Sequence, residues 1–179
     1  MYQEQRQIKA AKEGDLSALN DLIRSYYLEI YKYCFWHIKN KEQAEDITQE
    51  TFYKAIRFLA AYKNNGTFRA FLYKIALNTC IDHQKKKTEM LDEHIPEIIY
   101  EESGFKQSED TLDFEKFLVP LNDRQKELVI LRFGQDLSFR EIAEVTGSKL
   151  RTVQTEIRRS LKKIEKFNGK EPRSHESNI

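Results

Sequence analysis

Glycine and proline are scarce in this chain, at 6 and 3 of its 179 residues. This scarcity excludes collagen-like and low-complexity chains, which are rich in both residues. The sequence also lacks any apolar run close to the roughly 20 residues that a membrane span requires, and its first residues, MYQEQRQIKA, lack the apolar stretch of a secretory signal. We therefore expect a folded cytoplasmic protein with no direct membrane insertion.

Cysteine and histidine are also few, which limits the chemistry that the chain can carry. The two cysteines, Cys34 and Cys80, lie far apart and fall at apolar positions of helical patterns, so we expect them to be reduced core residues. The four histidines show no metal-ligand spacing. Because a phosphate-binding glycine loop, a nucleophile elbow and a paired-carboxylate motif are also missing, we expect no enzyme activity, no cofactor, no bound metal and no small-molecule substrate.

The formal net charge of +1 hides a segregation of charge along the chain. Residues 1–88 carry 15 Lys and Arg against 10 Asp and Glu, residues 89–118 carry 2 against 10, and residues 119–179 carry 13 against 9. Two basic blocks separated by an acidic segment indicate two polyanion-binding units joined by a segment that avoids DNA. A solvated linker between ordinary surfaces explains the same pattern equally well.

Residues 1–87 place apolar side chains at steps of three and four, the period of the α-helix. Helices are predicted over residues 3–13, 15–38 and 41–62, and from residue 68 into the three lysines at 85–87, with Asn40 and Thr67 as N-caps. This range therefore forms one compact helical bundle. The positions that we expect inside it include Leu16, Leu19, Ile23, Ile30, Cys34, Ile38, Ala44, Ile47, Thr51, Ala55, Phe58, Phe68, Phe71, Leu72, Ile75, Ala76 and Thr79.

Residues 88–111 are acidic, contain Pro96 and show no sustained period, and we interpret them as a linker. Residues 112–167 return to the helical period, with the spacing of two capping boxes at Asn122 with Gln125 and at Ser138 with Glu141. Gly147 separates a short helix from a last one that begins near residue 150, which indicates a helix-turn-helix. Residues 168–179 form a polar tail. Since no strand pattern appears, the predicted fold class is all-α, with two small helical domains joined by an acidic linker.

The last predicted helix has a basic face opposite its buried one. Leu150, Val153, Ile157, Leu161 and Ile164 are expected inside, which at roughly 100° per residue leaves the opposite side polar. An α-helix fits the major groove of DNA, where Arg can donate to guanine and Gln to adenine. The candidate base readers are Gln154, Thr155, Arg158 and Arg159. The candidate phosphate contacts are Arg151, Lys162, Lys163 and Lys166. A solvated charged helix face is the alternative.

Three motifs carry a family resemblance. They are Asp46-Ile47-Thr48-Gln49-Glu50-Thr51-Phe52, Phe68-Arg69-Ala70-Phe71-Leu72-Tyr73-Lys74-Ile75-Ala76-Leu77-Asn78, and Leu137-Ser138-Phe139-Arg140-Glu141-Ile142-Ala143 with Thr152-Val153. With them the chain resembles the extracytoplasmic-function sigma factors over about residues 8–87 and 112–166. The resemblance implies a factor that binds core RNA polymerase and promoter DNA, and a partner anti-sigma factor.

The resemblance also assigns roles to residues. Asp46, Gln49, Glu50 and Phe52 match the surface that family members dock on the clamp helices of the largest polymerase subunit. The segment from Tyr62 to Asn78 matches the reader of the minus-ten element, where a flipped base is held. Its candidate residues are Tyr62, Asn64, Asn65, Thr67, Arg69, Tyr73, Lys74 and Asn78, among which the roles of Tyr62 and Tyr73 stay open. Arg151, Thr152, Gln154, Thr155, Arg158, Arg159 and Lys162 are the candidate contacts to the minus-thirty-five element.

The last domain departs from the common pattern of the family at three positions. Ser148 lies one place before the usual capping serine, Arg151 replaces a frequent glycine, and Glu156 replaces a frequent basic residue. These changes affect the promoter sequence that we expect, and leave the expected fold intact. By resemblance the acidic linker runs through the basic channels of the polymerase, although a solvated tether explains its composition as well. The alternative functions are a stand-alone helix-turn-helix regulator and a helical adaptor that does not bind DNA.

Overall fold

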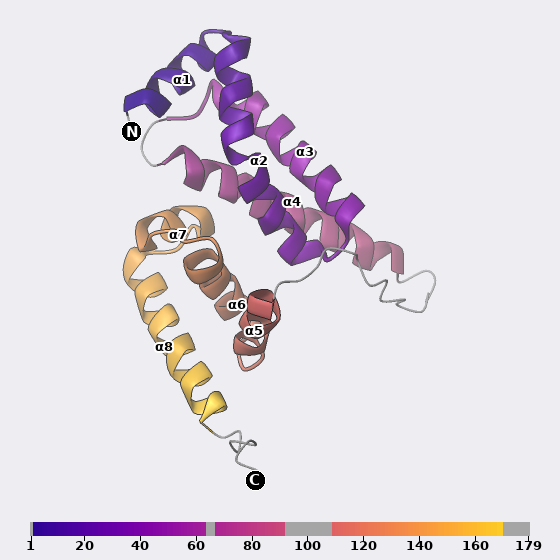
Figure 1. The fold of residues 1–179 in the computed structure, drawn as a ribbon, viewed down its shortest axis with the longest axis vertical. Coiled ribbons are helices and arrows are strands. Elements are labelled where there is room, and N and C mark those ends of the chain that lie inside the picture. Colours follow the sequence, from indigo (N-terminus) through magenta and orange to yellow (C-terminus); the bar gives the residue numbers. More distant parts are fainter. Residues whose placement is uncertain (1, 64–66, 92–108, 170–179) are drawn as a thin grey trace, which may run out of the picture. The chain divides into compact units, whose positions relative to one another are not determined.

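The computed structural model describes residues 2–63, 67–91 and 109–169, and within these ranges all regular secondary structure is helical, with no strand. The first unit contains α1 (Tyr2–Lys12), α2 (Leu16–Ile38), α3 (Lys41–Leu59) and α4 (Phe68–Leu91). The second contains α5 (Glu109–Leu118), α6 (Asp123–Val129), the π-helical turn η1 (Ile130–Gly134), most of α7 (Phe139–Thr146), and α8 (Leu150–Asn168). Figure 1 shows these elements along the chain. The predicted all-α class with two helical domains is confirmed.

Local signals in the sequence fix where the helices of the first unit begin. The Asp15 carboxylate accepts hydrogen bonds from two amides of the first turn of α2, and the Asn40 side chain accepts one from the Gln43 amide at 2.9 Å. The Thr67 hydroxyl accepts one from the Ala70 amide at 3.1 Å. Since short polar side chains satisfy helix amides that have no partner within the helix, the two N-caps predicted at Asn40 and Thr67 are confirmed.

The core of the first unit lies where α2, α3 and α4 pack against one another, and α1 packs against α2 (Figure 1). Cys34 and Cys80 are both buried free thiols, as predicted, and the two side chains hydrogen-bond to each other. The hydroxyls of Thr48 and Thr51 donate to carbonyls one turn earlier on α3, which satisfies these polar groups inside the core.

Two predicted core positions of the first unit are wrong. Phe58 is 53% exposed and Leu16 is 72% exposed, whereas Phe52 and Leu59 of α3 are buried. Toward its C-terminal end, α3 therefore buries residues 52, 55 and 59. The predicted inward series instead ended at Phe58, one residue before Leu59. Helical periodicity permits either series, and only the packing of α2 and α4 selects one of them.

Helix α4 ends at Leu91, four residues beyond the predicted end at residue 87, and α5 begins at Glu109, inside the predicted linker. Residues 88–91 contain no glycine or proline, so nothing in the sequence stops the helix there. The remaining linker positions, 92–108, and the predicted tail beyond residue 169 lie outside the described residues. The domain boundaries at residues 87 and 112 stay predictions.

In the second unit the turn between α7 and α8 has the predicted form. Gly147 has a φ of +65°, a backbone conformation that side chains other than glycine rarely adopt. Ser138 and Glu141 form the predicted capping box, because the Ser138 amide donates to the Glu141 carboxylate at 2.9 Å and the Glu141 amide donates to the Ser138 hydroxyl at 3.3 Å. Helix, glycine turn and helix therefore form the expected helix-turn-helix.

The other predicted capping box is only half correct. Asn122 does cap α6 through the Gln125 amide at 2.9 Å. The side chain of Gln125 is 5% exposed, and it bonds to Glu156 and Lys163 of α8. Gln125 therefore joins α6 to α8, a role that its spacing from Asn122 could not indicate.

Helix α8 buries a narrower face than predicted. Val153, Ile157 and Ser160 are buried and Ile164 is half-buried, whereas Leu161 is 44% exposed and Leu150 is exposed as well. Residues 153, 157 and 160 follow one another at steps of four and three, so they line a single seam against α6. The expectation that Leu150 and Leu161 lie inside is wrong because the partner surface covers only this seam.

Candidate nucleic-acid and polymerase interfaces

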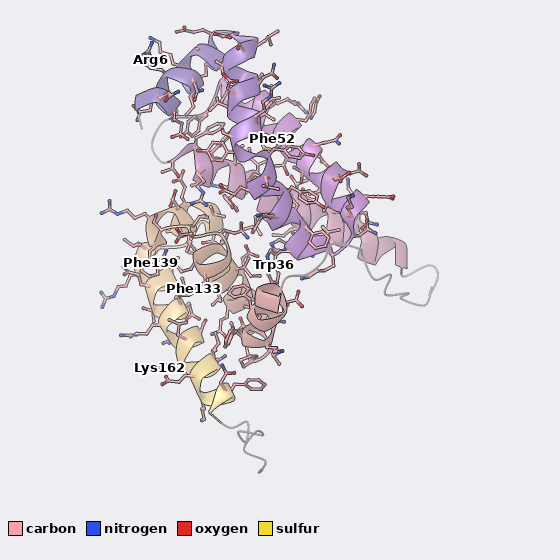
Figure 2. The ribbon with its side chains drawn as sticks, viewed as in Figure 1. Arg6, Trp36, Phe52, Phe133, Phe139 and Lys162 are labelled. Carbon is pink, nitrogen blue, oxygen red and sulfur yellow. The ribbon has the colours of Figure 1, made fainter. Side chains whose placement is uncertain are left out.

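Helix α8 carries an exposed polar face on the side away from its buried seam. Val153 is fully buried, which fixes the direction of the seam. The side chains that are exposed on the remaining surface include Arg151, Thr152, Gln154, Arg158, Arg159 and Lys162, the last of which is labelled in Figure 2. Five long polar side chains and one threonine on the exposed surface of one helix provide donors for base edges and charges for phosphates.

Thr155 differs from the other candidates on α8, because it is half-buried and its hydroxyl donates to the Arg151 carbonyl at 2.8 Å. A hydroxyl has a single proton to donate. Thr155 is therefore left with acceptor capacity and its methyl group for any contact with a base.

The start of α8 reflects the shifted serine. Lys149 occupies the N-cap position and makes no side-chain capping bond, while the Ser148 hydroxyl accepts a hydrogen bond from Arg124 at 3.2 Å. The first-turn amides of α8 therefore lack the side-chain cap that a serine at residue 149 provides in the common family pattern. A helix N-terminus of this kind attracts phosphate oxygens.

Arg159 and Glu156 form an ion pair that sequence reasoning missed. An Arg159 guanidinium nitrogen lies 2.8 Å from a Glu156 carboxylate oxygen, three residues earlier on α8. The same carboxylate accepts a longer hydrogen bond from Gln125 of α6 at 3.4 Å. Residues 156 and 159 have the i,i+3 spacing at which such a pair can form. The acidic residue at position 156, where the family frequently has a basic one, was the sequence signal that could have revealed it.

On α3 the motif residues divide between surface and core. Asp46, Gln49 and Glu50 are exposed, whereas Phe52 is 6% exposed. The Phe52 ring stacks on Tyr27 of α2 with centroids 5.9 Å apart, and Figure 2 labels it between the two helices. Phe52 is therefore placed to support the surface from beneath, while the other three side chains are exposed at the surface, where a partner protein can contact them.

The exposed face of α3 is more apolar than the motif suggests. Tyr53, Ile56 and Phe58 are exposed on the same helix as Gln49 and Glu50. Glu50 pairs with Lys54 at 2.8 Å, and Lys54 also donates to the Thr79 hydroxyl of α4 at 3.2 Å. Exposed apolar side chains beside polar ones are typical of protein interfaces. Sequence reasoning missed this feature because it assigned Phe58 to the core and did not consider Tyr53 or Ile56.

The aromatic candidates near the start of α4 are core residues. Tyr62 is 6% exposed and packs against Phe68 and Phe71, while Tyr73 is fully buried against Tyr33 of α2. Burial raises the pKa of Tyr62 to about 12. Burial also raises the pKa of Tyr73, and its hydrogen bond with the Glu29 carboxylate acts in the same direction. Neither ring is available to stack on a base in this conformation.

Arg69 is held on the protein by two interactions. Its guanidinium forms an ion pair with Glu29 of α2 and lies 5.7 Å from the centroid of the Tyr73 ring. Both charged side chains are more than two-thirds buried, so the pair is a packed link between α2 and α4. Arg69 therefore positions the start of α4 in this conformation.

Exposed candidates remain at both sides of that link. Thr67 is exposed at the entrance of α4, although its hydroxyl caps the helix, and Lys74 and Asn78 are exposed about two and three turns further along. Ile81 and Lys85 continue the same line of exposed positions. Asn64 and Asn65 lie outside the described residues.

The described parts of the chain contain no group of three or more His, Cys, Asp or Glu side chains that could hold a metal ion. No helix within the described ranges is long and apolar enough to cross a membrane.

Family comparisons match both units of the chain. The sequence matches Sigma-70 region 2 over residues 22–89 and Sigma-70, region 4 over residues 113–164. The RNA polymerase sigma factor SigV of Bacillus subtilis is 33% identical over 84% of this chain and 91% of that protein. The ECF RNA polymerase sigma factor SigW of the same organism is 28% identical over 90% of this chain and 94% of that protein.

Two solved structures have the same fold. The structure of CnrH in complex with the cytosolic domain of CnrY has a TM-score of 0.71 at 19% identity and covers 94% of this chain and 99% of that one. The sigma factor RpoE, in complex with the anti-sigma factor NepR from Bartonella quintana, has a TM-score of 0.67 at 19% identity and covers 86% of this chain and 98% of that one.

Proposed function

The chain belongs to the extracytoplasmic-function group of the sigma-70 family and directs transcription initiation at particular promoters, and we propose that it divides this work between its two units. The first unit docks on core RNA polymerase and opens the minus-ten element. The second unit binds the minus-thirty-five element. We take residues 1–87 and 112–167 as the two working domains, with residues 88–111 as their acidic connection.

The observation that carries the proposal is the exposed basic face of α8 in a helix-turn-helix. Arg158 and Gln154 are exposed with side chains that can bond base edges in the major groove, while Arg151 and Lys162 are placed to contact phosphates. Thr152, Thr155 and Arg159 complete the proposed surface. Because this face is opposite the buried Val153, DNA can approach it without disturbing the core.

Docking on the polymerase is assigned to the exposed part of α3. Asp46, Gln49 and Glu50 supply hydrogen bonds at this surface, and Phe52 holds α3 against α2 from below. Tyr53 and Ile56 add apolar area beside them. Interfaces with a few polar anchors and aromatic neighbours concentrate their binding energy in such clusters.

Opening of the minus-ten element is assigned to the turn before α4 and to the exposed side of that helix. Separating each base step costs on the order of 1–2 kcal/mol of stacking, which must be offset by captured bases and phosphate contacts. Thr67, Lys74 and Asn78 are exposed and supply such contacts, together with Asn64 and Asn65 of the preceding turn. Tyr62, Arg69 and Tyr73 shape this surface from within the unit. We propose no catalytic role for any residue of the chain.

A ligand-sensing regulator is the rival function, and the first unit offers little support for it. Its apolar hollow, of about 250 Å³ including open solvent, is lined only by apolar side chains such as Leu22, Ile56 and Leu72. A binding site for a small molecule usually adds a few convergent polar groups that orient the ligand. The other alternative, a helical adaptor that does not bind DNA, does not explain the basic face of α8.

We further propose that the protein works in the cytoplasm, where it meets the polymerase, and that an anti-sigma factor restrains it. Of the two structures of similar fold, CnrH was solved with the cytosolic domain of CnrY, and the sigma factor RpoE was solved with the anti-sigma factor NepR. The exposed apolar residues of α3 give such a partner a surface to bind, and a partner bound there competes with the polymerase.

The decisive experiment is run-off transcription with core RNA polymerase, fragmented genomic DNA and the full chain. Discrete transcripts that depend on the chain are expected, and their start sites give the promoter sequence. A matched reaction uses the chain with Arg158→Ala, which should lower transcript yield at the same start sites. Failure of the wild-type chain to bind core polymerase, with binding of DNA alone intact, would favour the stand-alone regulator.

A further inference from the structure

Four side chains link the DNA-facing side of α8 to the interior of the second unit. Arg159 pairs with Glu156 at 2.8 Å, and the Gln125 side-chain amide donates to Glu156 at 3.4 Å. The Gln125 carbonyl oxygen accepts a hydrogen bond from Lys163 at 2.8 Å. The series Arg159, Glu156, Gln125, Lys163 therefore begins and ends at exposed cations and passes through a buried amide.

Glu156 is held in place from the interior side. Its side chain is 22% exposed, and Gln125, which donates to it, is 5% exposed and fixed in the core between α6 and α8. An ion pair between fully exposed side chains samples many geometries and contributes little. Here Glu156 is anchored by a buried amide, so the pair draws the guanidinium of Arg159, whose side chain is 66% exposed, toward one direction.

The pair moves Arg159 away from the position that suits base reading. At roughly 100° per residue, Arg158 and Lys162 lie within about 40° of the direction opposite Val153, whereas Arg159 lies about 60° from it and Glu156 lies further round on the same flank. The bond to Glu156 draws the guanidinium further toward that flank. The remaining donors of Arg159 then face the edge of a docked DNA duplex, where phosphates are found.

We propose that Glu156 is a specificity-determining residue of α8, which acts by holding Arg159 on the flank of the helix at the phosphate backbone. Base reading by arginine then falls to Arg158. This inference rests on the proposed function of α8 in binding the minus-thirty-five element. It also explains what the acidic residue does at a position where the family frequently has a basic one. Glu156 keeps one arginine, Arg159, from contacting base edges.

The test measures how the full chain, bound to core polymerase, selects from promoters randomised across the minus-thirty-five element. Glu156→Gln keeps the side-chain length and an acceptor for Gln125, and it removes the charge that holds Arg159. We expect a three- to tenfold change of base preference at one or two adjacent base pairs. Because a released Arg159 still carries its charge, the base preference should change more than the overall affinity.

The double variant Glu156→Gln with Arg159→Ala separates two explanations. If Glu156 acts through Arg159, the change of preference disappears when Arg159 is absent. If the same change persists in the double variant, Glu156 acts on DNA by its own charge and the proposal is overturned. Glu165→Gln is the matched control, since it removes the same charge from an exposed position of the same helix and should leave the preference unchanged.

Arg159→Ala alone gives an independent test that does not require Glu156 to be changed. A phosphate contact predicts an affinity loss that is similar for all sequences and a salt slope lowered by about one unit. A selective loss at one base pair would identify Arg159 as a reader and overturn the proposal. Failure of the wild-type holoenzyme to select any minus-thirty-five sequence would contradict the proposed function itself, whereas selection that none of these variants alters would contradict only the role of Glu156.

Discussion

The candidate residues of the two units differ in how far they are accessible. On α8 of the second unit, six of the seven candidate contacts to the minus-thirty-five element are exposed, with Thr155 half-buried. In the first unit, Phe52, Tyr62 and Tyr73 are buried and Arg69 is tied to Glu29. The difference follows from packing, because α8 buries one seam whereas α3 and α4 are each covered by two neighbouring helices. A motif on a helix of the first unit therefore combines residues that contact a partner with residues that support them.

The largest expected effect separates a supporting residue from its exposed neighbour. Phe52→Ala removes a buried ring that stacks on Tyr27, and such a substitution lowers the free energy of unfolding by about 3–5 kcal/mol. Tyr53→Ala, at the next and exposed position, should change it by less than about 0.5 kcal/mol. Chemical denaturation of both variants measures the difference. Equal stabilities would show that Phe52 is not part of the core.

Exposed residues of the same motif should affect binding and leave stability unchanged. Replacing Gln49 and Glu50 together by Ala should cost at least about 2 kcal/mol, or roughly 30-fold, in affinity for core polymerase. The loss of the exposed Glu50 pair with Lys54 costs the fold at most about 0.5 kcal/mol.

An anisotropy titration with core polymerase measures this loss, and thermal melting monitors the fold. The matched control replaces Asn20 and Asp21, an exposed amide and carboxylate on α2, and should bind as the wild type does. Wild-type affinity of the Gln49 and Glu50 double variant, with intact folding, would remove this segment from the interface.

Within the second unit, two exposed residues should differ in the kind of loss that they cause. Arg158→Ala should remove about 1–3 kcal/mol of discrimination at one base pair. Lys162→Ala should weaken binding to all sequences alike and lower the salt slope by about one unit. Competition binding with single-base variants of the promoter, repeated at several salt concentrations, distinguishes the two. Equal and sequence-independent losses for both variants would refute Arg158 as a reader.

The sequence predicted the features that depend on contacts between residues close in sequence. Helix starts at Asn40, Thr67 and Ser138 and the turn at Gly147 depend on contacts within four residues, so local spacing was sufficient to place them. The inward direction of α8 followed from the position of Val153 alone.

The failures involve residues whose partners lie far away in sequence. Phe58 was assigned to the core because the period of α3 permits two inward series, and the neighbouring helices select the other. Leu161 lies beyond the narrow seam that α6 covers. Gln125 and Glu156 are 31 residues apart, and no local pattern indicates that they meet. Tertiary packing decided each of these positions.

One experiment tests the division of labour between the two units most directly. Holoenzymes with Asn78→Ala in the first unit and Arg158→Ala in the second are compared on one duplex promoter, scoring initial binding and the permanganate reactivity of promoter thymines. Asn78→Ala should bind nearly as the wild type does and lose thymine reactivity, because it removes a contact to opened DNA. Arg158→Ala should bind less, yet the complexes that form should open normally. Unchanged thymine reactivity in Asn78→Ala, or an opening defect in bound Arg158→Ala complexes, would contradict this account.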